Sequence, residues 1–399
     1  MRVVRRIFGG DVDPAIRPLV ILQTFGSMAA SCLFTFNGIW ALEHLGATPT
    51  QLGIAFLLMA GAAMFTGVLG GHISDRIGRR PMMLVGRGVF SIGALGALAA
   101  GENALAGLAV IVLVGALSSL GDAADSAMVA DLVGPDDREG AYAALRVASN
   151  FGVVLGPPIG GLLLARSWNT LFIGAACLSM VAFVLAWLLI PQRGRFTPEQ
   201  GEEHPRVSVV FRDRPYMALL AGSVLAYMVY VGFELLLPIS AVQHHGIDRS
   251  LWGAIVIVNP LLVAVLQLRE TNAAQRFSPL TRMVAALALM GPPFLILGAA
   301  DAVPVVIAIV VVFVFGEMLW VPTLQAIAVD RAPAEQRGAY MGAFNATGGA
   351  AFALAPLLGL TVLSRFGDEA MWATMAGLAV LGSLVFAVVL RNRHVISNA

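Results

Sequence analysis

The stretch Gly71-His72-Ile73-Ser74-Asp75-Arg76-Ile77-Gly78-Arg79-Arg80 lies between two long apolar runs. The runs, residues 51–70 and 81–100, each have about the 20 residues that a helix needs to cross a bilayer. The stretch between them packs one carboxylate, three arginines and a helix-breaking glycine into six residues. A connection so short and so cationic is expected to stay on the cytoplasmic side of a membrane.

The composition of the whole chain agrees with a membrane protein of many spans. The 399 residues are 58% hydrophobic and 12% charged, with a mean hydropathy of +0.83, whereas soluble domains carry roughly 25% charged residues. The net charge is +1 and the arginines are dispersed along the chain, which argues against nucleic-acid binding. Cys32 and Cys177 lie inside apolar runs, so no disulfide framework is expected.

Apolar runs, divided at turn residues and charges, predict an all-α fold with twelve membrane-spanning helices. The expected spans are residues 17–43, 50–73, 81–100, 104–132, 138–166, 169–190, 215–243, 250–271, 280–299, 303–331, 335–364 and 370–390. Several exceed the length that a bilayer requires, so they are expected to tilt or to project beyond it.

The basic residues predict the orientation of these spans. All 25 are arginines, and with the N-terminus inside, all but Arg166, Arg249 and Arg365 fall at cytoplasmic ends or loops. Membrane proteins carry their excess of positive charge on the cytoplasmic side. The use of arginine without lysine, together with much Ala, Gly and Val, is the codon bias expected of a high-GC bacterial genome. We therefore expect a multi-pass protein of the bacterial cytoplasmic (inner) membrane with both termini in the cytoplasm.

The chain is expected to consist of two similar halves. Residues 191–214 form the one long polar connection, which gives an N-terminal six-helix bundle over residues 1–190 and a C-terminal one over residues 215–399. A shift of 199 residues matches pairs of charged, proline and glycine residues between the halves. The matched pairs are Asp131 with Asp330, Arg138 with Arg337, Pro157 with Pro356, and Gly160 with Gly359.

A second motif, Gly152-Val153-Val154-Leu155-Gly156-Pro157-Pro158-Ile159-Gly160-Gly161, lies in the expected fifth helix. Glycines four residues apart let two helix backbones approach closely. Prolines in the middle of a span bend the helix and free backbone carbonyls. From the residues alone, the motif predicts a tightly packed, kinked helix.

Both motifs resemble those of the major facilitator superfamily. The stretch at residues 71–80 resembles the superfamily signature between helices 2 and 3. The helix-5 motif resembles the G-x-x-x-G-P-x-x-G-G pattern that accompanies antiporters, especially twelve-helix drug/proton exporters. The resemblance implies two six-helix bundles around a central cavity lined by helices 1, 4, 7 and 10, which opens by rocking of the halves.

The resemblance also implies a charge relay that stabilises one conformation. Its members would be the loop residues Gly71, Asp75, Arg76, Arg79 and Arg80, together with Asp131 at the inner end of the fourth helix. Gly71 would pack against helix 11 of the other half. The alternative is a set of independent surface ion pairs, each worth roughly 0–1 kcal/mol.

Carboxylates inside the expected spans are candidate proton-coupling residues, because each costs a few kcal/mol in a bilayer. Glu317 lies near the middle of the tenth helix, and its apolar neighbours favour the protonated form. Its surroundings resemble the Gly-Glu…Pro segment of drug antiporters, where the glutamate takes part in proton or cation handling. Glu234 resembles a helix-7 carboxylate of some antiporters, or else lies ionised at the outer mouth.

Asp122 and Asp125 lie three residues apart on the fourth helix, so they share a face. Two carboxylates so close would share a proton and form a second proton site or a cation-attracting patch; alternatively, one pairs with Arg146. The family usually has an arginine four residues before a glycine of this helix. Counting from Gly121, that position holds Leu117, so the arginine is absent or replaced, for example by Arg146.

Polar and aromatic residues of the expected spans are candidates for lining a substrate cavity. They are Asn37, Arg146, Asn150, Tyr227, Tyr230 and Trp320. Most aromatic residues in such helices pack against neighbours, which is the alternative for these. The sequence contains no phosphate-binding loop, no nucleophile elbow and no zinc signature, so we expect no enzyme, no cofactor and no metal.

These observations predict a secondary active transporter that exports lipophilic or cationic small molecules in exchange for protons by alternating access. The expected partners are the substrate, protons and the lipid bilayer, with no nucleic acid, and the expected state is a monomer. One alternative is a proton-coupled importer of a sugar or organic acid. The other is a membrane receptor or scaffold that transports nothing, since fold does not fix function.

Overall fold

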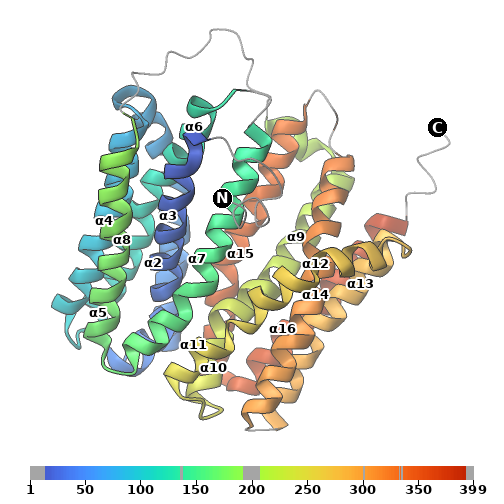
Figure 1. Ribbon diagram of the computed structural model, residues 1–399. Coiled ribbons are helices and arrows are strands. Elements are labelled where there is room, and N and C mark those ends of the chain that lie inside the picture. The colour runs from blue at the N-terminus through green and yellow to red at the C-terminus, as the bar shows by residue number, and fades with distance from the viewer. Residues whose placement is uncertain are drawn as a thin grey trace. The chain divides into compact units, whose positions relative to one another are not determined.

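The computed structural model describes residues 14–134, 138–191, 207–299, 302–331, 333 and 336–391. The described residues form helices and turns and contain no strand (Figure 1). Twelve helical segments are long and apolar enough to cross a membrane. The predicted all-α fold with twelve spans is therefore confirmed.

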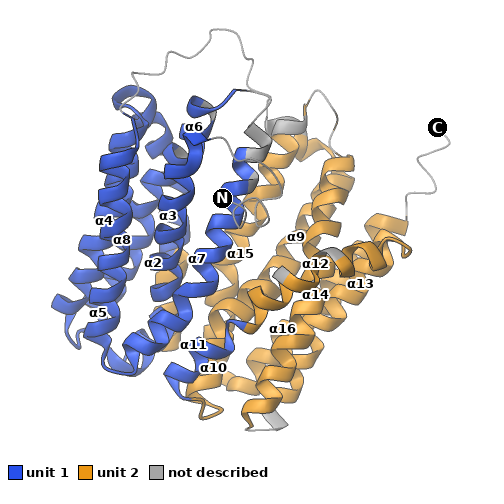
Figure 2. Cartoon of the chain, viewed as in Figure 1, with its two compact units in different colours: residues 1–47, 58–199, 248–257 blue, residues 48–57, 200–247, 258–399 orange. Residues whose placement is uncertain are grey.

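The chain divides into two compact units (Figure 2). Unit 1 comprises residues 1–47, 58–199 and 248–257. Its helical elements are η1 (Pro14–Ile16), α2 (Arg17–Ile39), η2 (Trp40–His44), α3 (Pro49–Ile77) from residue 58 onward, α4 (Arg79–Ala100), α5 (Ala104–Ser118), η3 (Ser119–Gly121), α6 (Asp122–Leu132), α7 (Arg138–Leu164), α8 (Trp168–Leu189) and α11 (Arg249–Ile255).

Unit 2 comprises residues 48–57, 200–247 and 258–399. Besides the start of α3, its helical elements are η5 (Val207–Arg212), α9 (Arg214–Val231), η6 (Gly232–Leu236), α10 (Leu237–Gln243), α12 (Val258–Ala274), α13 (Pro279–Met290), η7 (Pro292–Ala299), α14 (Val303–Arg331), α15 (Arg337–Phe366) and α16 (Asp368–Arg391). We expected two halves that are continuous in sequence. The units differ from that division because each takes one short segment, 248–257 or 48–57, from the other half of the chain.

A single glycine separates α3 from α4. Gly78 has φ +101° and ψ 158°, a conformation that only glycine adopts without strain. The polar loop expected over residues 71–80 is therefore almost entirely helical: Asp75 lies in the last turns of α3, and Arg79 begins α4. Because the turn takes one residue, these charged side chains occupy fixed helical positions.

Several spans contain segments that are not α-helical, including the turn between α11 and α12 in the eighth span and η7 in the ninth. The first and seventh spans include the π-helical segments η2 and η6. The fourth was expected as one helix over residues 104–132; residues 104–129 do form one candidate span, within which the 3₁₀ turn η3 separates α5 from α6. Neighbouring glycines crowd this turn: a Cβ on Gly70 would lie 2.7 Å from the Leu120 Cα, and one on Gly86 would lie 2.8 Å from the Ser118 carbonyl oxygen. Such breaks in a helix often mark functional positions.

The ends of the first and seventh spans have the same backbone geometry at a shift of 200 residues. Gly46 and Gly246 have φ values of +65° and +63°. The Ala47 N–H donates to the Ala41 carbonyl at 2.9 Å, and the Ile247 N–H donates to the Ala241 carbonyl at 3.0 Å. The similarity that the sequence shows between its halves therefore extends to the way these two helices terminate.

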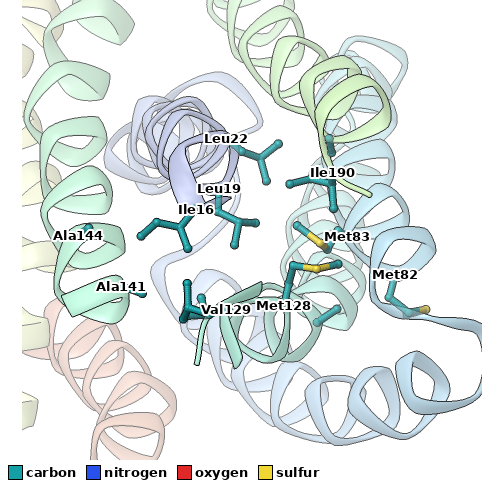
Figure 3. Packing of buried hydrophobic residues seen from close by; sticks show 13 residues of the cluster. Ile16, Leu19, Leu22, Met82, Met83, Met128, Val129, Ala141, Ala144 and Ile190 are labelled. Carbon is teal, nitrogen blue, oxygen red and sulfur yellow. The ribbon is translucent and has the colours of Figure 1, made fainter. Parts of the chain in front are cut away.

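An apolar cluster in unit 1 joins η1, α2, α4, α6, α7 and α8, with Ile190 directly after α8 (Figure 3). Its labelled members are Ile16, Leu19, Leu22, Met82, Met83, Met128, Val129, Ala141, Ala144 and Ile190. Burying such side chains contributes about 25 cal/mol per Å² of apolar surface removed from water. The cluster fixes α6, which carries Asp122 and Asp125, against α4.

Candidate functional site

The charges around Gly78 form a connected group in unit 1. An Arg79 terminal nitrogen donates to the Asp75 carboxylate and, at 2.7 Å, to the Ser74 hydroxyl. The Arg79 Nε lies 3.6 Å from the Asp131 carboxylate. One guanidinium thus contacts carboxylates of two spans, so the structure brings together three members of the predicted relay.

The other relay candidates have different surroundings. Arg80 donates to the backbone carbonyl of Trp187 in α8. Arg76 is exposed at the end of α3, and Gly71 is partly buried in the same helix. Among the described residues, neither Arg76 nor Arg80 forms an ion pair with the carboxylates that contact Arg79.

The glycines of the helix-5 motif pack α7 directly on α2. A Cβ on Gly152 would lie 2.8 Å from the Met28 backbone nitrogen, and one on Gly156 would lie 2.7 Å from the Met28 carbonyl oxygen. One turn further, a Cβ on Gly160 would lie 2.9 Å from the Cys32 carbonyl oxygen. Side chains larger than hydrogen would force these two helices apart.

A second face of the same motif packs on α11. A Cβ on Gly161 would lie 2.8 Å from the Ser250 carbonyl oxygen, and one on Gly253 would lie 2.6 Å from the Pro157 carbonyl oxygen. The motif therefore joins three helices of unit 1, and both of its faces depend on small residues.

Asp125 forms an ion pair with Arg87, which the sequence analysis had counted only among the arginines that set topology. The two terminal nitrogens of Arg87 lie 3.0 Å from the two Asp125 oxygens. Arg146, the partner considered from sequence, is exposed on α7. Asp122 is exposed at the start of α6, one turn before Asp125. Gly86, which lets α4 approach the fourth span, was the one sequence signal for this contact.

Two carboxylates within the spans of unit 2, Glu234 and Glu317, have neutral partners. Glu317 in α14 accepts a 2.7 Å hydrogen bond from the side-chain amide of Asn259 in α12. Glu234 lies in the π-helical segment η6 and accepts a 2.6 Å hydrogen bond from the Tyr230 hydroxyl. The two glutamates are close enough to act on each other electrostatically. Sequence reasoning singled out Asn37 and Asn150 but missed Asn259, because the sequence does not show which amide of an apolar run faces a carboxylate.

Aromatic rings lie on the same helix faces as these glutamates. The rings of Tyr227 and Trp320 have centroids 4.7 Å apart, and those of Tyr230 and Trp320 are 5.5 Å apart. Phe313 and Trp320 lie one turn before and one turn after Glu317 on α14, with the ring of Phe313 6.3 Å from that of Tyr230. Trp320 is buried. Three of the predicted cavity residues are therefore in contact with one another beside Glu317.

The remaining cavity candidates belong to unit 1. Asn37 is partly buried in α2, and Asn150, like Arg146, is exposed on α7. Leu117, at the position where the family has an arginine, is exposed at the end of α5. The structure therefore divides the predicted cavity residues between the two units. Among the described residues, no group of three or more His, Cys, Asp or Glu side chains could hold a metal ion.

Comparison with known proteins places this arrangement in a family. The family model described as Major Facilitator Superfamily matches residues 19–356 and 243–398. The chain is 26% identical over 361 residues to the protein named uncharacterized MFS-type transporter YttB of Bacillus subtilis, covering 90% of each chain. It is 26% identical over 311 residues to the multidrug resistance protein MdtH of Cronobacter sakazakii, covering 78% of this chain and 77% of that protein.

Solved structures show the same fold. The nucleoside transporter NupG superposes with a TM-score of 0.80 at 13% identity, covering 94% of this chain and 99% of that chain. The human organic anion transporter MFSD10 superposes with a TM-score of 0.62 at 20% identity, covering 93% and 98%. The chain is thus a multi-pass membrane transporter and not an enzyme, and it belongs to the Major Facilitator Superfamily.

Proposed function

We propose that the chain exports lipophilic, cationic small molecules in exchange for protons by alternating access. Two kinds of observation support this proposal. Relatives that are 26–27% identical over more than three quarters of the chain are named multidrug resistance proteins. In unit 2, two carboxylates with neutral partners lie on an aromatic helix face.

The pairing of Glu317 with Asn259 is the observation that carries the proposal. An amide has both a donor and an acceptor, and so does the hydroxyl of Tyr230 next to Glu234. Each carboxyl therefore keeps a hydrogen bond whether it is protonated or ionised. In the described part of the chain, no arginine forms an ion pair with either glutamate. Their charge can change during a transport cycle without leaving a buried cation uncompensated.

The aromatic residues beside these carboxylates suit a cationic, apolar substrate. The faces of Tyr and Trp rings attract cations, by roughly 0.5–2 kcal/mol depending on desolvation. An ionised glutamate adds direct attraction, which a proton on the same group removes. Proton and substrate thus compete for Glu234 and Glu317, and competition of this kind is what exchange requires.

The other predicted groups take supporting roles in this proposal. Asp122 and Asp125 provide a second carboxylate site in unit 1. The relay of Asp75, Arg79 and Asp131 stabilises one conformation, and substrate and protons shift the balance by their difference in affinity for the two states. The protein acts as a monomer in the bacterial inner membrane, with both termini in the cytoplasm, in accordance with its arginine distribution.

The test uses purified protein in sealed proteoliposomes that contain a pH-sensitive dye. Under an imposed proton gradient, lipophilic cations are expected to trigger proton movement, whereas sugars and organic acids are not. Glu317→Gln is expected to lower the cation-triggered rate by roughly 5–150-fold, the range of typical coupling free energies. Glu43→Gln, at an outer helix end, is the matched control and keeps the wild-type rate.

Two results would contradict this proposal. Wild-type proton movement in Glu317→Gln would remove Glu317 from the coupling mechanism. A response to sugars or organic acids and not to cations would make the protein an importer. Correct folding of each variant is checked by its elution as a single species in detergent.

A further inference from the structure

Arg87 is a buried arginine within the third membrane span. Its exposed fraction is 8%, and both of its terminal nitrogens lie 3.0 Å from the Asp125 carboxylate. One of these nitrogens also donates to the Met83 carbonyl at 3.0 Å. A bidentate pair, in which a guanidinium donates two parallel hydrogen bonds to a carboxylate, is among the strongest interactions of these two groups.

The surroundings of Arg87 hold its backbone and side chain in place. The hydroxyls of Ser91 and of Ser179 in α8 both donate to the Arg87 carbonyl at 3.0 Å. Gly86 allows α4 to lie directly against the 3₁₀ turn η3, and this contact brings Arg87 within reach of Asp125. Met83 and Met128, one turn from Arg87 and from Asp125, belong to the apolar cluster of unit 1.

This arrangement affects Asp125 and Asp122 differently. A guanidinium stays charged in proteins, so a proton on Asp125 would leave a buried cation without its counter-charge. Removing one partner of a buried pair in that way costs several kcal/mol. Among the described residues, Asp122 forms no such ion pair: it is exposed on α6, one turn before Asp125.

Other groups around α6 do not replace Arg87 in this role. On α7, the exposed Arg146 forms no ion pair within the described part of the chain, and the Tyr142 hydroxyl donates to the Ser126 carbonyl at 3.0 Å. Further along α6, Asp131 lies 3.6 Å from Arg79. Arg87 is therefore the cation that acts on this pair of aspartates among the described residues.

We infer that Arg87 is a positioning residue that keeps Asp125 ionised, so that Asp122 is the proton-exchanging carboxylate of unit 1. This inference rests on the proposed proton-coupled transport. It divides two neighbouring carboxylates into one of fixed charge and one of variable charge. It also predicts that the two aspartates do not share a proton. Their spacing in the sequence had led us to expect a shared proton.

The test measures which carboxyl groups carry a proton in the purified full-length transporter. A lipophilic carbodiimide reacts with protonated carboxyls in apolar surroundings, and mass spectrometry of peptides identifies each labelled residue. In the wild type, labelling of Asp122 is expected to increase as the pH falls, while Asp125 stays unlabelled. In Arg87→Met, labelling of Asp125 is expected to rise at least about tenfold, equal to about 1.4 kcal/mol.

Arg249→Met is the matched control, because it removes an arginine of unit 1 that pairs with Glu43 at 3.4 Å instead of with Asp125. It is expected to leave the labelling of Asp125 unchanged. If Arg87→Met does not fold, Arg87→Met/Asp125→Asn removes both charges and is expected to restore folding, with Asp122 still labelled. Labelling of Asp125 in the wild type that equals or exceeds labelling of Asp122 would overturn the inference.

The labelling result is independent of the proposed transport. Failure of cation-driven proton movement in proteoliposomes would contradict the proposed function and leave the labelling pattern as it is. Labelling of Asp125 in the wild type, with Glu317-dependent transport intact, would contradict only the role of Arg87.

Discussion

Units 1 and 2 both hold carboxylates within membrane-spanning helices, but with different partners. In unit 1, Asp125 faces the guanidinium of Arg87. In unit 2, Glu317 faces the amide of Asn259, and Glu234 faces the phenol of Tyr230. A cationic partner favours one charge state, whereas a neutral partner with a donor and an acceptor accommodates two. On the proposals above, a carboxylate is therefore expected to keep its charge in unit 1 and to change it in unit 2.

The two units also differ in how their helices approach. The first half has Gly152 and Gly156 where the second half, at a shift of 199 residues, has Ala351 and Ala355. In unit 1 these glycines place α7 in backbone contact with α2. Both alanines of unit 2 are fully buried in α15. The packing around α15 therefore accommodates a Cβ atom at these two positions. Close helix packing and the Arg87–Asp125 ion pair therefore occur together in unit 1.

The largest expected effect comes from removing the counter-charge of Arg87. Asp125→Asn is expected to lower the free energy of unfolding by about 3–5 kcal/mol, because a buried guanidinium loses its partner. Glu317→Gln is the matched variant in unit 2 and is expected to change it by less than about 1 kcal/mol, since glutamine still accepts the hydrogen bond from Asn259. Thermal unfolding of the detergent-solubilised proteins measures both. Equal losses in the two variants would remove the distinction between the sites.

The next effect tests the difference in packing. Gly156→Ala is expected to destabilise the protein by about 1–3 kcal/mol, because its Cβ would lie 2.7 Å from the Met28 carbonyl oxygen. Gly348→Ala in α15 is the control: the nearest atom to its Cβ, on Tyr227, lies 3.8 Å away. This second variant is expected to be neutral or more stable by up to about 1 kcal/mol. The same thermal assay compares them, and a stable Gly156→Ala would refute the packing argument.

A smaller effect concerns the neutral partner of Glu317. Asn259→Ala is expected to cost roughly 0.6–1.7 kcal/mol, the range of side-chain hydrogen bonds measured between membrane helices. Gln267→Ala removes a 3.0 Å bond between the same two helices, to the Met318 carbonyl, without touching a carboxyl. Infrared difference spectra should show a shifted carboxyl stretch in Asn259→Ala and none in Gln267→Ala. Shifts of equal size in both variants would show that Asn259 has no special effect on Glu317.

The smallest effect comes from a carboxylate outside the spans, Asp248. Hydrogen bonds from the Ser250 hydroxyl and backbone N–H lower the pKa of Asp248 below its usual value. Its stabilising contribution is therefore complete above the usual carboxyl range and is lost as the pH falls through the lowered pKa. Asp248→Ala is expected to cost about 0.5–1 kcal/mol near neutral pH and nothing in strong acid, as measured by thermal unfolding across pH. Asp248→Asn, which keeps a side-chain acceptor, should lose little at either pH.

The twelve spans could be predicted because apolar length alone specifies a membrane helix. The local backbone conformations within these spans could not be predicted from the sequence. The one-residue turn at Gly78 depends on its φ value, and the break at η3 depends on how closely Gly70 and Gly86 approach it from neighbouring helices. The rule that assigns spans counts apolar residues, and it is insensitive to such local contacts.

The candidate site was predictable where residue type is unusual for its surroundings. Glu317 and Glu234 are conspicuous in apolar runs, and the aromatic residues beside them share their helical spacing. The partners of these groups were not predictable. Asn259 is an ordinary residue for a helix, and Arg87 lies near enough to Arg79 and Arg80 to be counted with them as a topological charge.

The packing of α7 on α11 has a consequence for biosynthesis. Gly161 meets the Ser250–Gly253 turn, which the ribosome adds roughly 90 residues later, a delay of about 5–20 s at ordinary rates of translation. Until then, the Pro157–Gly161 face of the nascent fifth span lacks its neighbour in unit 1. The N-terminal half therefore matures only after part of the C-terminal half has been made. Truncated chains that end before residue 248 should accordingly be recognised by the cell as incomplete.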